Sequence, residues 1–470
     1  MGMDDRIFND SKISRVLFKF AIPAIVSLLV AELYNMVDTV FVGRYVGTEA
    51  IGALTIAFPV QRFLISIGLL IAVGTSTLVA RNLGKQNKEG LISSILNALT
   101  MVFIALITIS AITFFFRKNI ITALGASSVT YPLAEKYITI ILIGGIFQSI
   151  GVVACYIMTA LGNTKITLYS NSLGAIINII IDFFLVAILG FGVAGAAIAT
   201  IVSQIIAFIY AMIEFKKVKD NFNLKFSFKL MLKSLQASVI WTILAVGFST
   251  FVIEISDAVV AVVLNNLLFA NGGDSAIVIV GVITRVSMFM FITIIGVSSA
   301  MQPIVAYNYG KQNFKKMKET LRVGITSVTI TSLVLWLILM IFAKPIIGFF
   351  LKDASLLSDA VTAFRICISL LPSVGLYYTV IYYYQAIGAA KKSFILSIYR
   401  QILIFIPVVF IMVNLFGLMG AWLSYPISDF ISSVTSLFFM NKALGEKFYS
   451  EEEIEEKAAK SLRQKAAKTI

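Results

Sequence analysis

The chain has 470 residues, of which 59% are hydrophobic and 13% are charged, and its mean hydropathy is +0.95. A core surrounded by water cannot take up so many apolar side chains, so this composition excludes a soluble globular protein and indicates that the solvent is lipid. The net charge of +14 does not indicate nucleic-acid binding, because the basic residues gather in alternate loops between apolar segments.

Apolar segments long enough to span a bilayer follow one another along the whole chain. They lie at 16–42, 50–80, 92–116, 133–158, 167–190, 193–215, 238–270, 276–305, 320–350, 361–387, 393–416 and 418–441. Most exceed the roughly 20 residues that one span needs, so tilted or bent helices are expected. Barrel strands would instead show alternating segments of about 10 residues. We therefore predict an all-α membrane protein with twelve transmembrane helices.

The distribution of lysine and arginine predicts the orientation. The loops before the first segment and after the second, sixth and eighth are rich in them, whereas most alternate loops are poor. The positive-inside rule then predicts a multi-pass protein of the plasma (inner) membrane with both termini in the cytoplasm. The first apolar stretch is too long for a signal peptide and lacks a small-residue cleavage site, so no cleavable signal is expected.

A short phrase occurs twice in the chain. Gly84-Lys85-Gln86-Asn87 returns 226 residues later as Gly310-Lys311-Gln312-Asn313, each time just after a long apolar segment. Two further phrases align at the same spacing or at one residue less. The chain is therefore predicted to contain two copies of one membrane unit, which is the usual build of a secondary transporter.

The repeat also predicts the domain organisation. Each copy has an even number of segments, so both start on the same side and are parallel repeats. The predicted parts are an N-lobe at 1–215, a cytoplasmic linker at 216–237, a C-lobe at 238–442 and a cytoplasmic tail at 443–470. Lysines at every fourth position of the linker predict a helix on the leaflet surface or a plain basic loop. The tail is predicted to be a solvated polar helix.

Charged residues at membrane depth are the candidates for function, because they are costly in lipid. The acidic ones are Glu32, Asp38, Asp182, Glu254, Asp257 and Asp429, and the basic ones are Arg62 and Arg285. With no histidine in the chain, proton or cation chemistry must use carboxylates.

The spacing around two of these acids predicts an ion site. Asp38 follows Asn35 by three residues and Asp182 follows Asn178 by four, so each pair shares a helix face. Carboxylate, amide and hydroxyl oxygens, the last from Thr200, suit Na⁺, and the same carboxylates can carry a proton. A structural hydrogen-bond network is the alternative.

The acid cluster has no counterpart in the second copy. The repeat spacing takes Asp38 to Leu264 and Asp182 to Pro407. A structural need of the shared fold should appear in both copies, so the asymmetry favours function.

Three further acidic candidates lie in the second copy. Glu254 and Asp257 share a face and predict a second proton or substrate site, or one of them pairs with Arg285 or lies near a cavity mouth. Asp429 follows Pro426 and is expected to bind the backbone donors freed there.

Four further features of the chain concern a cavity, movement and packing. Glu32 would line a central cavity, and Pro23 would bend the first helix as a moving part or as a static kink. Five tyrosines between 377 and 384 suit flat cations or an interfacial belt. Cys155 and Cys367 are expected to be small packing residues.

No nucleotide-binding, hydrolase or zinc motif is present in the sequence, so an enzyme is not predicted. Without a phosphate-binding loop for ATP, the expected drive is an ion gradient.

These residues together resemble the multidrug and toxic compound extrusion (MATE) transporters. The resemblance rests on 35–43 at the end of the first helix, on the two Gly-Lys-Gln-Asn loops, and on Asn178, Asp182 and Thr200. It spans roughly residues 15–442 and is strongest for the bacterial branch that includes the Firmicute multidrug exporters.

The resemblance implies two pseudo-symmetric six-helix lobes forming a V, with drug efflux driven by Na⁺ or H⁺ entry. The cation site it implies consists of Asp38, Asn178, Asp182 and Thr200, with Tyr137 a weaker match. Pro23 matches the bending proline of the family. Some relatives use an acidic pair on helices 7 and 10, but here only Glu254 is present, because no carboxylate lies between Ile366 and Ile387.

We therefore expect an antiporter, acting as a monomer without cofactor, that exports lipophilic and mostly cationic compounds in exchange for H⁺ or Na⁺. A lipid-linked oligosaccharide flippase is one alternative, although the acids expected at the cavity outnumber Arg62 and Arg285. A membrane receptor or scaffold without transport is the other, and the unequal copies with their buried acids speak against it.

Overall fold

The computed structural model describes residues 7–8, 12–224, 234–351 and 355–446, apart from the side chains of Asn35 and Thr48. Helices and short turns make up these ranges. In the first half they are α1 (Ile13–Tyr45), α2 (Thr48–Gly84), α3 (Lys88–Phe115), α4 (Arg117–Ala123), α5 (Thr130–Ala160), α6 (Ile166–Asp182), the π-helix η2 (Phe183–Ile188) and α7 (Gly192–Phe222).

The second half begins with one very long helix and ends with one that contains a proline. Its elements are α9 (Ala237–Gly310), α10 (Phe314–Ile341), α11 (Ala343–Phe350), α12 (Leu357–Ile368), the 3₁₀ turn η3 (Leu371–Ser373), α13 (Val374–Ala386), α14 (Ala390–Ile398), the π-helix η4 (Tyr399–Phe405), α15 (Ile406–Phe416) and α16 (Leu418–Gly445).

The predicted all-helical membrane fold is confirmed. Ten described helical stretches are long and apolar enough to cross a membrane. One of them, α9, has 74 residues and would be about 110 Å long if straight, far more than a bilayer of about 30 Å. Gly273 breaks it with φ 62° and ψ −155°, so α9 makes two spans. Counted with α16, which is not among the ten, the described residues contain twelve membrane spans.

The repeated phrase turns out to be a helix-to-helix turn. Gln86 and Gln312 both take the left-handed backbone conformation, with φ 57° and 58°. The following asparagines cap the next helices, because Asn87 Oδ1 accepts the Gly90 N–H at 2.9 Å and Asn313 Oδ1 accepts the Lys316 N–H at 3.1 Å. The two copies therefore share local chemistry as well as sequence.

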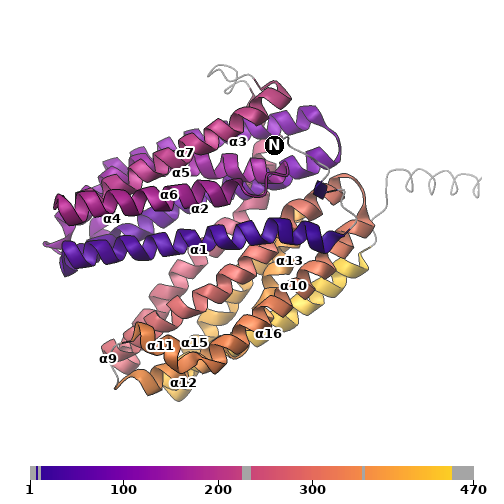
Figure 1. Ribbon diagram of the computed structural model, residues 1–470. Helices are drawn as coiled ribbons and strands as arrows, with labels where there is room; N and C mark the ends of the chain where they lie inside the picture. Colours follow the sequence, from indigo (N-terminus) through magenta and orange to yellow (C-terminus); the bar gives the residue numbers. More distant parts are fainter. Residues whose placement is uncertain (1–6, 9–11, 225–233, 352–354, 447–470) are drawn as a thin grey trace, which may run out of the picture.

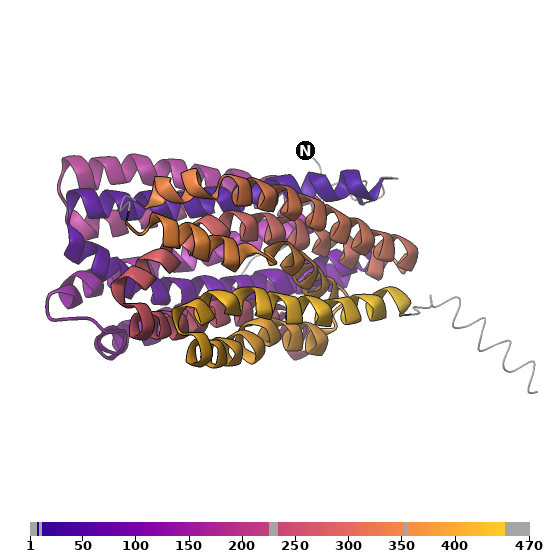
Figure 2. The ribbon, with the colours of Figure 1, turned by 90° about the horizontal axis from the view of Figure 1, so that it is seen from below.

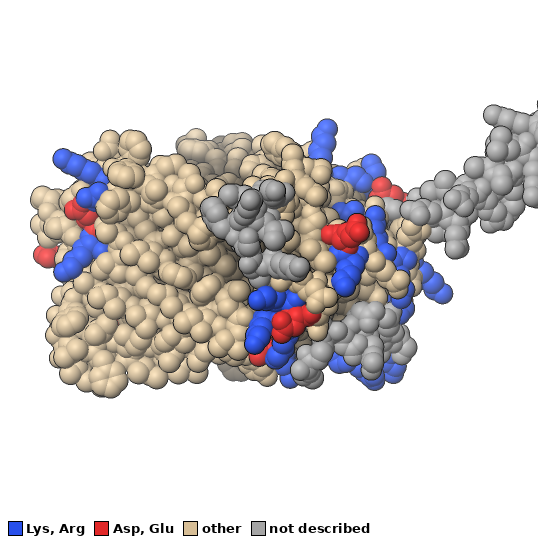
Figure 3. Space-filling view, turned by 90° about the horizontal axis from the view of Figure 1, so that it is seen from above, with Lys and Arg blue, Asp and Glu red and all other residues tan. Residues whose placement is uncertain are grey.

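Two groups of helices form the molecule. Figure 1 shows α1–α7 in one group and α9–α16 in the other, meeting at one end and diverging toward the end that carries α4 and α11. The view from below shows the same long, nearly parallel helices (Figure 2). On the face in Figure 3, Lys, Arg, Asp and Glu lie at the two ends, and a broad band between them carries none. This band matches a protein embedded in lipid.

The lobes approach each other closely at several glycines, and the repeated glycines are among them. A Cβ atom at Gly84 would be 2.1 Å from the carbonyl oxygen of Tyr307, and one at Gly310 would be 2.1 Å from that of Arg81. Only glycine allows this approach of one backbone to another. The two equivalent glycines thus hold the ends of α2 and α9 together across the pseudo-symmetry axis.

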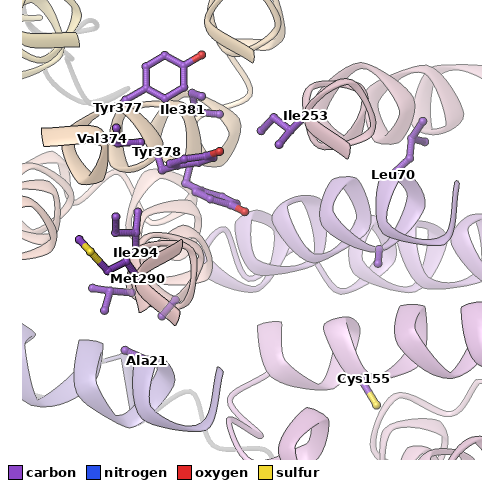
Figure 4. Packing of buried hydrophobic residues seen from close by; sticks show 14 of the residues in the cluster. Ala21, Leu70, Cys155, Ile253, Met290, Ile294, Val374, Tyr377, Tyr378 and Ile381 are labelled. Carbon is purple, nitrogen blue, oxygen red and sulfur yellow. The ribbon is translucent and has the colours of Figure 1, made fainter. Parts of the chain in front are cut away.

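The tyrosine-rich stretch is buried, so the expected interfacial belt is wrong, whereas contact with flat cations stays a prediction. Tyr383 and Tyr384 are fully buried on α13, and the Tyr384 hydroxyl donates to the Phe439 carbonyl at 3.1 Å. Tyr377 and Tyr378 belong to the buried cluster, and Figure 4 shows the Tyr377 ring on the side of its helix that faces away from Met290. The hydroxyls of Tyr377 and Tyr384 can be buried because carbonyls of neighbouring helices accept their hydrogen bonds, that of Leu396 in the case of Tyr377.

Two smaller expectations have different outcomes. Cys155 and Cys367 are buried free thiols, which confirms their packing role. The helix α7 continues to Phe222, into the stretch predicted as linker, and the Lys217 ammonium pairs with Glu214 at 2.6 Å there. The proposed linker helix at 225–233 and the tail from 447 lie outside the described residues.

Candidate functional site

The predicted ion site is a buried polar cluster inside the N-lobe. Asp38 comes from α1, Asn178 and Asp182 from α6, and Thr200 from α7, and all four side chains are buried. The carboxyl groups of Asp38 and Asp182 lie close enough to each other for their charges to interact. The structure therefore brings together residues that are up to 162 positions apart in the sequence, counted from Asp38 to Thr200.

Local helix geometry explains how α6 presents its two polar groups. Asn178 and Asp182 are one turn apart, so both face the lobe interior. The helix then changes to the π-helical η2 immediately after Asp182. A π-helical turn is rare, and it commonly marks a functional position because it widens the helix at some cost in hydrogen-bond geometry.

The cluster contains polar atoms that have no partner. Neither oxygen of Asp182, neither polar atom of the Asn178 side chain, and not Oδ1 of Asp38 has a hydrogen-bond partner among the described residues. No described ion pair involves either aspartate. Two neighbouring carboxylates that are buried away from water cannot both stay charged without compensation. The cluster therefore fits a proton or a small hard cation, which oxygen ligands suit.

Two tyrosines complete the cluster. Tyr137 on α5 lies beside Thr200 and Asp38, as the weaker match suggested. Tyr34 was missed, and its hydroxyl donates to Thr200 Oγ1 at 3.3 Å. A sequence signal for Tyr34 existed, because it precedes Asp38 by four residues and so shares its helix face. The side chain of Asn35 lies outside the described part of the chain.

The C-lobe holds a compensated ion pair in place of such a cluster. Arg400 Nη2 and Nε donate to Asp429 Oδ1 at 2.8 and 3.1 Å, and the two side chains are only 6% and 1% exposed. The expectation that Asp429 binds freed backbone donors is therefore wrong, since the guanidinium is a stronger donor than an amide. Arg400 was missed, although a charge in the apolar segment 393–416 was visible in the sequence.

The pairing expected for the acids of the seventh span is also wrong. Glu254 Oε2 accepts from Arg62 Nη1 at 3.1 Å, and Asp257 accepts from Gln401. Arg285 is exposed. Arg62 lies 192 residues before Glu254, so this pair does not follow from spacing along one helix. It forms because tertiary packing brings the faces of two helices together.

Glu32 and Pro23 lie on α1, which is at the edge of its helix group that faces the other group in Figure 1. Glu32 is half-buried and lies in the field of Arg62 and Arg285. Near Pro23, Ser27 accepts a hydrogen bond from Asn171 of α6 at 2.8 Å, and Gly296 of α9 packs closely on Ile25. The helix α1 thus contacts both lobes near its proline, and a hinge at Pro23 stays a prediction.

The fold and the site together define a class of protein. Two repeated membrane lobes meet at one end, and one of them holds uncompensated carboxyl groups at membrane depth. Such paired halves are the architecture of secondary transporters.

The comparison with known families identifies the chain further. The MatE family profile matches residues 23–184 and again residues 245–411, once in each lobe. The chain belongs to this family, the multidrug and toxic compound extrusion (MATE) transporters. The double match agrees with the internal repeat.

Curated relatives and solved structures agree with this assignment. The multidrug export protein MepA of Staphylococcus saprophyticus is 26% identical over 439 residues, covering 92% of this chain and 94% of its own length. MepA of Staphylococcus haemolyticus is 27% identical with the same coverage. An outward-facing MATE family transporter of the MOP superfamily matches with a TM-score of 0.87 and 23% identity, over 93% of this chain and 97% of its own. A MOP superfamily transporter from Pyrococcus furiosus, described as having a binding pocket of reverse polarity, matches equally well, with 23% identity over 94% and 98%.

Proposed function

We propose that this chain exports lipophilic, mostly cationic compounds across the plasma membrane in exchange for H⁺ or Na⁺ that enters at the Asp38–Asp182 cluster. The observation that carries the proposal is the buried pair of carboxyl groups in the N-lobe, which has no counter-ion among the described residues. The multidrug export relatives support the cargo class. Both termini would lie in the cytoplasm, at the end where the lobes meet, and the chain would act as a monomer.

The proposed cycle links ion occupancy to cargo binding. In the form that is open to the outside, the cluster takes up H⁺ or Na⁺, which neutralises the two aspartates. Neutralisation changes which arrangement of α1 is preferred, because α1 carries Asp38 and packs on both lobes. Cargo then leaves. In the form that is open to the cytoplasm, the ion leaves and cargo binds again.

A gradient experiment tests the proposal. The purified chain is reconstituted in proteoliposomes that contain ethidium, and either a pH gradient or a Na⁺ gradient is imposed alone. Efflux is expected under one of the two gradients, and that gradient names the coupling ion. Collapse of the gradient by an ionophore should stop efflux.

Two results would contradict the proposal. Efflux that persists without either gradient would exclude ion coupling. No efflux under either gradient, together with movement of a lipid pyrophosphate between leaflets, would favour the flippase alternative. The excess of Glu32, Glu254 and Asp257 over Arg62 and Arg285 argues for cationic cargo and against an anionic one.

A further inference from the structure

The Arg62–Glu254 ion pair joins the two lobes. Arg62 lies on α2 and Glu254 on the first span of α9, and their nearest atoms, Nη1 and Oε2, are 3.1 Å apart. The side chains are 39% and 26% exposed, so the pair is neither a core contact nor a freely solvated one. By contrast, Arg117–Glu135 and Arg400–Asp429 each lie within one lobe.

The pair lies at one end of a seam, which is the line along which α2 and α9 contact each other. Along the seam, Gly74 lies against the backbone of Ile243, and the Phe63 and Phe251 rings meet edge to face at 6.2 Å. The next contact along both helices is Arg62–Glu254. Past this point α2 runs back to Thr48 and α9 runs on to its break at Gly273, in the direction in which the lobes diverge (Figure 1). The ion pair therefore lies where the lobes separate.

The guanidinium of Arg62 makes two kinds of contact there. It pairs with the Glu254 carboxylate, and its Cζ lies 5.1 Å from the centre of the Phe58 ring. A carboxylate and an aromatic ring that share one cation are the set of contacts that a lipophilic organic cation uses, because the ring face attracts the cation while it covers its apolar part.

We propose that Arg62 is a tethered competitor of cationic cargo: in the form in which the lobes meet at their cytoplasmic end, it occupies the Glu254 carboxylate and the Phe58 ring and so displaces the cargo cation. This inference rests on the proposed function. Arg62 and Glu254 are carried by different lobes, so movement of one lobe against the other separates them. Glu254 then becomes available to cargo, and the return movement restores the pair and expels the cation.

Binding of radiolabelled tetraphenylphosphonium to the purified chain in nanodiscs tests the competitor. Arg62→Gln removes the internal cation, so we expect binding to tighten about tenfold, as for the loss of a partly desolvated cation–carboxylate and cation–π contact. Net efflux should slow, because release from Glu254 becomes harder. Arg62→Lys keeps the charge and should stay within about threefold of the wild type.

A matched control exists in the same lobe. The Arg117 guanidinium donates to Glu135 at 2.9 Å and lies 4.6 Å from the centre of the Phe114 ring, with similar exposure of both partners. It therefore repeats the chemistry of Arg62 without joining the lobes. Arg117→Gln should leave tetraphenylphosphonium affinity and efflux unchanged.

Glu254→Gln separates a competitor from a simple latch between the lobes. A latch is broken equally by either substitution, so both variants would shift affinity in the same direction. A competitor predicts opposite signs: tighter binding for Arg62→Gln and loss of binding for Glu254→Gln, with the double variant resembling Glu254→Gln. Equal signs, or unchanged affinity in Arg62→Gln, would overturn the inference.

The failure of this inference is distinguishable from failure of the proposed function. If the wild type neither binds tetraphenylphosphonium nor exports it under a gradient, the proposed function fails. If the wild type exports the cation but Arg62→Gln does not bind it more tightly, only the competitor fails.

Discussion

The two lobes surround their buried charged side chains in different ways. The N-lobe holds Asp38 and Asp182 against each other with no described counter-ion, whereas the C-lobe holds Asp429 in a two-point contact with Arg400. Both arrangements lie at or beside a π-helical segment of the fifth span of their lobe. A charged residue at membrane depth therefore does not by itself indicate an ion site. An ion site is indicated where no side chain of opposite charge compensates that residue.

The largest expected difference between the lobes is in transport. Asp38→Asn or Asp182→Asn should reduce gradient-driven efflux to background, because an amide can neither carry the proton nor supply the charge that holds a cation. Both variants should still reach the membrane in wild-type amounts, since neutralising an uncompensated carboxylate does not leave a buried charge. Efflux from proteoliposomes and the amount of reconstituted protein are measured together.

A conservative control for these variants is Asp274→Asn. Asp274 is exposed beside the break in α9 at Gly273, so the same chemical change there should leave efflux unchanged. Wild-type efflux in Asp38→Asn would contradict the assignment of the N-lobe cluster as the ion site.

The second prediction concerns stability in the C-lobe. Asp429→Asn leaves the Arg400 guanidinium buried without its counter-ion, which costs about 3–5 kcal/mol. The melting temperature in detergent should therefore fall by several degrees, while Asp38→Asn should change it much less. If Asp429→Asn abolished coupling and kept its melting temperature, the comparison between the lobes would be reversed.

The third prediction removes the C-lobe pair altogether. Arg400→Met combined with Asp429→Leu replaces both charges by apolar groups, and such replacements are often neutral or stabilising. The double variant should recover most of the stability that Asp429→Asn loses, as measured by thermal unfolding in detergent. Loss of efflux in a stable double variant would show that the pair takes part in transport.

The smallest expected effect concerns the support of the N-lobe cluster. Tyr34→Phe removes the hydroxyl that donates to Thr200 at 3.3 Å, a bond worth about 1 kcal/mol. We expect the half-saturating concentration of the coupling ion to change by a few fold, with efflux retained. Tyr45→Phe, at the exposed end of α1, is the matched control and should have no effect. A complete loss of efflux in Tyr34→Phe would assign the hydroxyl a direct role.

The sequence by itself determined the class of fold and the N-lobe cluster. Composition placed the chain in lipid, and segment lengths with the repeated glycine phrase predicted the spans and the two copies. Asp38 and Asp182 were found because each has a polar neighbour three or four residues away, and such spacing is local and survives in any helix.

Only the tertiary structure decided which distant charges meet. Arg400 and Asp429 are 29 residues apart and Arg62 and Glu254 are 192 apart, and neither pair follows from a local pattern. Helices in lipid are apolar on all sides, so the sequence carries no amphipathic stripe that fixes how each helix is rotated toward its neighbours. The rotation is set by close packing, as at Gly84 and Gly310, and the packing then places each charge opposite its partner.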